Sequence, residues 1–91
     1  MPRYRITLPV KSSLTVDIDA DSPEGAVQRA VDLFHRPSGE HLAFSVYEVG
    51  KLRDEEVRRA NAGRKRSLSQ EDLDHFYRET KFLGTFEIDT P

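Results

Sequence analysis

The sequence contains no cysteine and no tryptophan, and only one methionine, among its 91 residues. Without cysteine the chain can form no disulfide and offers no thiolate to a metal, which fits a reducing compartment. There is no apolar run close to the roughly 20 residues that cross a membrane, and no signal peptide is visible. These absences predict a cytoplasmic protein without membrane contact. The length of 91 residues predicts a single domain over residues 1–91.

The chain also lacks a strong excess of one charge, with 14 basic and 16 acidic residues and a formal net charge of −2. The charges are unevenly distributed, because residues 51–66 hold seven basic and three acidic side chains. The remaining sequence holds seven basic and thirteen acidic ones. We interpret 51–67 as a basic insertion, either a marginal helix over 54–62 that Asp54 caps and Gly63 ends, or a mobile arm.

Two adjacent runs, 3–10 and 14–20, alternate apolar with polar residues, which predicts two half-buried strands joined by a hairpin. A polar connection at 11–13 suits the turn. Pro9 lacks a backbone donor, so we expect a free edge of the first strand near it. A turn centred on Ser12 keeps all apolar residues on one face. The expected pairs are Val10 with Leu14, Leu8 with Val16, Ile6 with Ile18, Tyr4 with Ala20, Thr7 with Asp17, and Arg5 with Asp19.

A helix is predicted to begin after Ser22, a good N-cap, with Pro23 at its first position. It carries an apolar stripe and ends near residues 35–36, before Pro37. The stripe consists of Ala26, Val27, Ala30, Val31 and Phe34.

Three further elements follow. We predict a third strand over 42–49, a helix over 69–79 capped by Ser69, and a final strand over 81–88. In the last strand, Phe82, Phe86 and Ile88 are expected on one face and Leu83 on the other, with Gly84 permitting a bulge.

The predicted fold class is α+β: a small, mostly antiparallel four-stranded sheet with one or two packed helices. The elements follow in the order β-β-α-β-(α)-α-β. The third strand could pair with either hairpin strand, and two copies could pair through a free sheet edge near Pro9 or Ile88.

The segment 16–30 reads Val-Asp-Ile-Asp-Ala-Asp-Ser-Pro-Glu-Gly-Ala-Val-Gln-Arg-Ala, the end of a strand followed by a capped helix. Within residues 3–49 the chain resembles the DpnD/PcfM-like small proteins of phages and conjugative elements. HicB-type antitoxins have a similar order of elements. The resemblance implies a small accessory protein of a mobile element that binds something larger. In size and type the chain is similar to phage inhibitors of host defence, including anti-CRISPR proteins.

Residues 51–66, which we call the basic segment, supply the candidate binding residues. It could contact phosphates, with Tyr47 or Tyr77 as a stacking face, or dock on an acidic protein surface, or be a solvated surface without a partner. Its basic residues are Lys51, Arg53, Arg58, Arg59, Arg64, Lys65 and Arg66.

Three histidines, His35, His41 and His75, are the candidates for catalysis or metal binding. No two of them have the i, i+4 spacing of a helical zinc site, so we expect structural or solvent roles, no metal and no cofactor. Asp17 and Asp19 could hold a cation, but an ion pair with Arg5 favours a structural role.

The first functional hypothesis is therefore a non-enzymatic, anti-CRISPR-like inhibitor or regulator acting in the host cytoplasm. It would sterically block a larger host protein or ribonucleoprotein through residues 51–66. The alternative is a nucleic-acid-binding accessory protein that uses the same segment. A small nuclease or toxin with a catalytic histidine is the third hypothesis.

Overall fold

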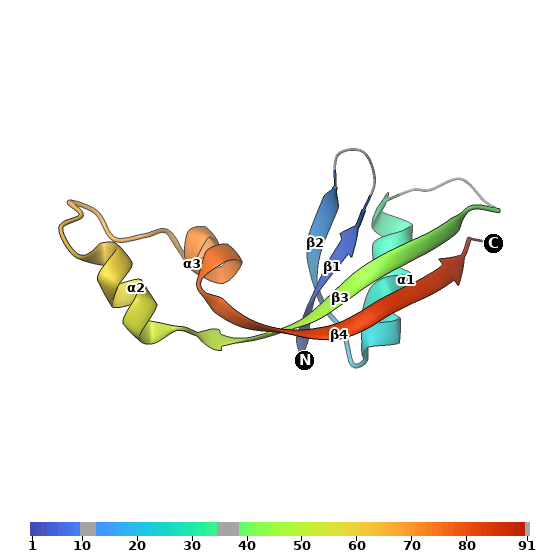
Figure 1. The fold of residues 1–91 in the computed structure, drawn as a ribbon, viewed down its shortest axis with the longest axis horizontal. Helices are drawn as coiled ribbons and strands as arrows, with labels where there is room; N and C mark the ends of the chain where they lie inside the picture. The colour runs from blue at the N-terminus through green and yellow to red at the C-terminus, as the bar shows by residue number, and fades with distance from the viewer. Residues whose placement is uncertain (10–12, 35–38, 91) are drawn as a thin grey trace. The chain divides into compact units, whose positions relative to one another are not determined.

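The computed structural model of the chain describes residues 1–9, 13–34 and 39–90. Within them lie four strands and three helices, arranged as a small α+β fold (Figure 1). The sheet has the strand order β2-β1-β3-β4, and β1 pairs antiparallel with both β2 and β3. The predicted fold class is confirmed. The elements are β1 (Arg3–Leu8), β2 (Leu14–Asp19), α1 (Pro23–Phe34), β3 (His41–Leu52), α2 (Asp54–Asn61), α3 (Gln70–Phe76) and β4 (Arg78–Asp89).

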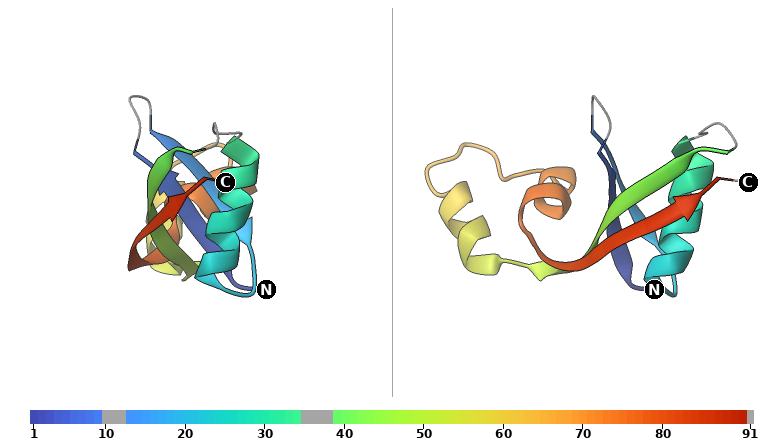
Figure 2. Two further views of the ribbon diagram at one scale, coloured as in Figure 1. Left: turned by 90° about the vertical axis from the view of Figure 1, so that its right-hand side faces the viewer. Right: turned by 45° about the vertical axis from the view of Figure 1, so that its right-hand side comes forward.

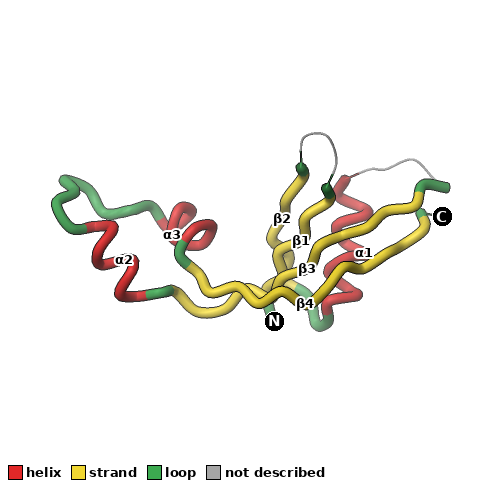
Figure 3. The backbone as a smooth tube through the Cα atoms, in the orientation of Figure 1, coloured by secondary structure: helices red, strands yellow, loops and turns green. Residues whose placement is uncertain are grey.

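The chain forms two compact units, which we describe separately. The first comprises Met1–Val49 with Lys81–Pro91, and the second is Gly50–Thr80. The long strands β3 and β4 run through both units (Figure 3). The predicted basic insertion at 51–67 lies wholly inside the second unit, and its mobility stays a prediction.

The core of the first unit lies between α1 and one face of the sheet (Figure 2). Small residues of α1, Ala26 and Ala30, are fully buried and let the helix lie close to the strands. Phe34 stacks on Phe44 with ring centroids 6.3 Å apart, as expected of the last residue of the stripe. The buried apolar residues are Tyr4, Ile6, Leu8, Ile18, Ala20, Ala26, Val27, Ala30, Leu42, Phe44 and Val46.

The predicted cap of α1 is confirmed. The backbone N–H of Gly25 donates to Ser22 Oγ over 3.1 Å, and Pro23 is the first helical residue. The expected end of this helix at 35–36, with Pro37 and the candidate His35, lies outside the described residues.

The hairpin faces are as predicted, but the predicted register is wrong by two residues. Tyr4 pairs with Ile18 rather than with Ala20. A slip of two residues leaves every side chain on the same face, so the apolar pattern cannot detect it. The ion pairs cannot detect it either. The observed register pairs Arg3 with Asp19 and Arg5 with Asp17, and the predicted one would set the same two arginines opposite Asp21 and Asp19. The observed pairs are Arg3 with Asp19, Tyr4 with Ile18, Arg5 with Asp17, Ile6 with Val16, Thr7 with Thr15, and Leu8 with Leu14.

The predicted free edge of the first strand is also wrong. β1 lies between β2 and β3, and Pro9 falls beyond its last residue, Leu8. The sheet edges are therefore β2 and β4. Val10, the predicted partner of Leu14, and Ser12, the predicted centre of the turn, lie outside the described residues.

The faces of the last strand differ from the prediction as well. Leu83 packs against the core together with Phe86 and Ile88, whereas Phe82 is 56% exposed. The reason is Gly84, whose φ of 132° interrupts the alternation between Leu83 and Phe86. Phe82 instead packs against Tyr47 in the first unit, with ring centroids 5.2 Å apart.

Both long strands extend further than predicted. The predicted helix over 69–79 ends at Phe76, because the carbonyl of Tyr77 accepts the N–H of Arg53 over 2.7 Å as β3 and β4 pair. The predicted cap of this helix is confirmed, since Ser69 Oγ accepts the N–H of Asp72 over 3.2 Å.

The ion pair of Arg5 and Asp17 allows the register to be tested. The guanidinium donates twice to the carboxylate, over 2.8 and 3.1 Å, and both side chains are largely covered. A double-mutant cycle of Arg5→Gln and Asp17→Asn, measured by urea unfolding, should give a coupling energy of about 1 kcal/mol. The control cycle of Arg5→Gln with Asp19→Asn should give a coupling near zero. A larger coupling in the control cycle would contradict this register.

Thr90 allows a second test, because it is the one buried polar side chain among the described residues. Its hydroxyl accepts the N–H of Glu40 over 2.7 Å and donates to the Glu40 carbonyl over 3.1 Å. Thr90→Val should lower the free energy of unfolding by about 1–3 kcal/mol, since it leaves the Glu40 N–H without that acceptor. Thr90→Ser keeps the hydroxyl and should cost clearly less. Equal losses in the two variants would show that the hydroxyl does not matter.

Candidate functional site

The basic segment consists of the end of β3, the helix α2 and the loop after it. Acidic residues occupy the first turn of α2, and Arg58 and Arg59 occupy its last turn, so both ends complement the helix dipole. Gly63, at φ 77°, follows the helix as predicted. Asp54 does not cap the helix as predicted: it is the first helical residue, and the N-cap position belongs to Arg53, which makes no side-chain cap bond.

Three of the seven predicted binding residues are engaged inside the second unit. Arg53 pairs with Glu56 over 3.3 Å and donates to the Phe76 carbonyl over 2.9 Å. Arg59 pairs with Glu55 over 2.9 Å, and Arg64 donates to a backbone carbonyl of α2 over 2.7 Å.

The other four are Lys51, Arg58, Lys65 and Arg66, which we call the open cations. All four are exposed, and within the described ranges their side chains make no ion pair or hydrogen bond. The positive charge available to a partner is therefore smaller than the sequence suggests, and it is concentrated in these four side chains.

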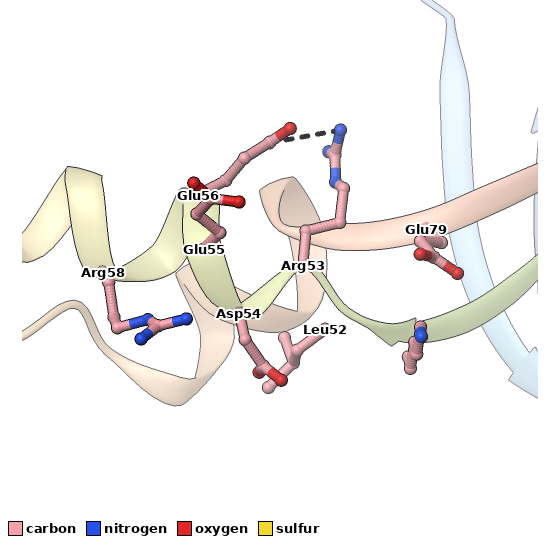
Figure 4. A pocket seen from close by; sticks show the side chains of 8 residues that line it. Leu52, Arg53, Asp54, Glu55, Glu56, Arg58 and Glu79 are labelled. Carbon is pink, nitrogen blue, oxygen red and sulfur yellow. Dashed lines mark ion pairs between the residues drawn. The ribbon is translucent and has the colours of Figure 1, made fainter.

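Two of the open cations, Lys51 and Arg58, line a shallow hollow at the start of α2. Leu52, Asp54 and Arg58 point to one side of the helix, while the Arg53–Glu56 ion pair lies on the other (Figure 4). Glu79 lines the same hollow. Charges of both signs thus surround one apolar side chain.

The second unit has no core. None of residues 50–80, all of which the structure describes, is buried, and Phe76 is 61% exposed. Polar bonds hold the unit together instead. Asn61 Oδ1 accepts the N–H of Leu68 over 3.0 Å, and Arg78 pairs with Asp74 over 2.8 Å and donates to the Gly50 carbonyl over 3.2 Å.

The two tyrosines predicted as stacking faces belong to different units. Tyr77 shares the second unit with the basic segment and is half-buried. Tyr47 belongs to the first unit, where its ring packs against Phe82.

The described histidines have different environments. His41, on β3, contacts Asp89 through Nδ1 over 2.7 Å and Glu87 through Nε2 over 3.4 Å. His75 lies edge-on to Phe76 at a centroid distance of 4.5 Å. Within residues 1–9, 13–34 and 39–90, no three histidine or acidic side chains are arranged to hold a metal.

Comparisons with protein-family models, curated proteins and solved structures find no match to the chain. The resemblance of residues 3–49 to DpnD/PcfM-like proteins therefore stays a prediction. In the part of the chain that the structure describes, no helix is long and apolar enough to cross a membrane.

The sequence alone did not show which of the seven basic residues are engaged in contacts within the second unit and which are open to a partner. The spacing carried part of that information, because Glu55 and Arg59 are four residues apart and Arg53 and Glu56 three apart, the separations at which helical side chains meet. The bonds from Arg53 and Arg64 to backbone carbonyls left no such pattern.

The contacts of His41 predict a pH dependence. Hydrogen bonds to Asp89, and then to Glu87, raise the pKa of His41 above its ordinary 6.5. The folded state therefore binds this proton more tightly than the unfolded state does, so the stabilisation is complete below pH 6.5 and is lost as the pH rises through the folded-state pKa. NMR titration should show a raised pKa, which falls towards 6.5 in Asp89→Asn. A His41 that titrates at or below 6.5 in the unmutated protein would contradict this geometry.

Proposed function

We propose that the chain is a non-enzymatic binding protein that docks on a larger protein through the open cations of its second unit, and so blocks or regulates that protein. The observation that carries the proposal is the combination of four exposed, unpaired cations with a unit that has no buried residue. Such a unit gains apolar burial and charge pairing by contact with another surface.

The open cations favour an acidic protein surface as the docking site. Lysine and arginine without intramolecular partners lose no existing ion pair on binding, and arginine is enriched at protein interfaces. Mixed charges around Leu52 also suit a folded surface, which offers both signs of charge beside apolar groups.

The resemblance to small proteins of phages and conjugative elements supports a more specific version of this proposal. In that version the chain is an anti-CRISPR-like inhibitor, and its partner is a host protein or ribonucleoprotein in the cytoplasm. Steric blocking requires only tight docking, so no catalytic group enters the mechanism.

Nucleic-acid binding is the second candidate function, and the adjacent Lys65 and Arg66 favour it. A phosphate backbone attracts a surface of uniform positive charge. The second unit contains eight basic and seven acidic residues, however, with acids in the first turns of both α2 and α3. This near balance supports a protein partner over a polyanion.

The open cations can be tested against the paired ones. A variant that changes Lys51, Arg58, Lys65 and Arg66 to alanine should recover about tenfold less of its partner from host lysate than the unmutated chain. The matched control is Arg59→Ala, which removes an arginine of the same helix that is already paired with Glu55. This control should recover the partner nearly as well.

The pull-down is run with and without nuclease, and the partner is identified by mass spectrometry. One stoichiometric protein recovered in both conditions supports the proposal. Recovery that disappears with nuclease, together with direct binding to short DNA or RNA that weakens steeply with salt, would replace it with the nucleic-acid function. Equal recovery by the fourfold variant would exclude docking through the open cations.

A further inference from the structure

The two edges of the sheet differ in how well they are protected against pairing with another strand. β4 has the interruption at Gly84 and carries exposed charges at Lys81 and Glu87. Bulges, charges and prolines are the devices that protect edge strands. β2 keeps one constant register with β1 over its whole length and contains no proline, lysine or glycine. Its two charged residues, Asp17 and Asp19, are in ion pairs with β1. Within the described ranges β2 pairs with β1 alone, so its other edge is open.

The hydrogen-bonding pattern between β1 and β2 shows which backbone groups of β2 face the open edge. The N–H of Ala20 donates to the Pro2 carbonyl over 3.1 Å, so residue 20 belongs to a hydrogen-bonded pair. Such pairs alternate along an antiparallel ladder, which directs the N–H and C=O groups of Thr15, Asp17 and Asp19 away from β1. The contact of Arg29 agrees with this, because its guanidinium donates to the Asp19 carbonyl over 2.8 Å.

A hollow lies beside this edge, on the side of the sheet that α1 covers. Its lining combines apolar and charged groups, and the α1 residue Leu33 is 56% exposed in it. Neighbouring residues of paired strands project to the same face. Alternate side chains of a strand added to β2 would therefore enter the hollow. Its lining residues are Asp17, Ile18, Arg29, Asp32 and Leu33.

The charges indicate what kind of strand fits. Asp32 is exposed, and among the described residues its carboxylate has no partner. Asp21 and Glu24 are also exposed near the junction of β2 and α1, and Arg29 is occupied by the Asp19 carbonyl. A second copy of β2 would bring the same acids against these, which disfavours self-pairing. Basic residues are the complementary ones.

We propose that β2 and α1 form a binding site for an extended segment of a partner protein in which an apolar residue and a basic residue lie two positions apart. The segment hydrogen-bonds to the backbone of Thr15 and Asp17. Residues two positions apart project to the same face, so the apolar side chain lies against Leu33 while the basic one reaches Asp32. Main-chain bonds supply affinity and the hollow supplies selectivity. This site lies in the first unit and does not depend on the open cations.

The probe is the capped hexapeptide acetyl-Lys-Thr-Val-Thr-Lys-Thr-amide, whose two lysines and valine share one face, added to the full-length, isotopically labelled protein. The NMR signals of Thr15 and Asp17 should shift in a saturable way, and their amide protons should exchange more slowly. Two peptides serve as controls, one with N-methyl groups on alternate residues to block main-chain bonding, and one with glutamate in place of the basic residues. Both should bind at least about tenfold more weakly.

Asp32→Lys should weaken binding of the basic peptide by about tenfold, whereas Glu71→Lys, the same charge change on α3, should not. The inference is overturned if the basic peptide gives no saturable shift, if it binds equally well when N-methylated, or if the shifts fall outside β2 and α1. Light scattering on the free protein provides one more outcome. A dimer whose contact shifts lie on β2 would make a second copy the occupant and would also overturn the inference.

Discussion

The first unit depends on the position of β1 between β2 and β3. The inner face of β1 carries Tyr4, Ile6 and Leu8, which are all buried, while its outer face carries Arg3 and Arg5 in ion pairs with β2. One strand thus supplies the centre of the core and also the two arginines of the cross-strand ion pairs. The fold of residues 1–49 follows from this arrangement, because α1 can cover only the face to which the apolar residues point.

The second unit is built on a different physical basis. It has no buried side chain. The Ser69 cap of α3, ion pairs within and next to α2, and bonds from side chains to backbone carbonyls take the place of a core. Exposed ion pairs contribute roughly 0–1 kcal/mol each, so such a unit has little stability of its own. A partner surface that covers Phe76 and pairs the open cations would add what the unit lacks. The lack of buried residues therefore accounts for the low internal stability of the unit and also motivates the proposed docking.

Much of the fold could be predicted from the sequence, because the alternation of Tyr4 to Leu8 and the Ser22 cap are local signals. The register could not be predicted from polarity or charge, since a slip of two residues preserves both faces. Because Asp17, Asp19 and Asp21 are spaced by two, it also leaves Arg3 and Arg5 opposite aspartates. The faces of β4 depended on the conformation of Gly84, which a sequence permits but does not specify. In the candidate site the seven cations were found by composition. Helical spacing indicates the pairs of Arg59 with Glu55 and of Arg53 with Glu56, but it does not indicate the bond from Arg64 to the Ala60 carbonyl.

The central claim is that the first unit has a hydrophobic core and the second unit has none. Native-state hydrogen exchange measured by NMR tests this claim most directly. Amides of β1, α1 and the first-unit part of β3 should exchange only by global unfolding. Those of α2 and α3 should exchange at least about a hundredfold faster, because opening the second unit exposes almost no buried apolar surface. Equal protection in the two units would contradict the account, since it would mean that residues 50–80 are stabilised by a core that the structure does not contain.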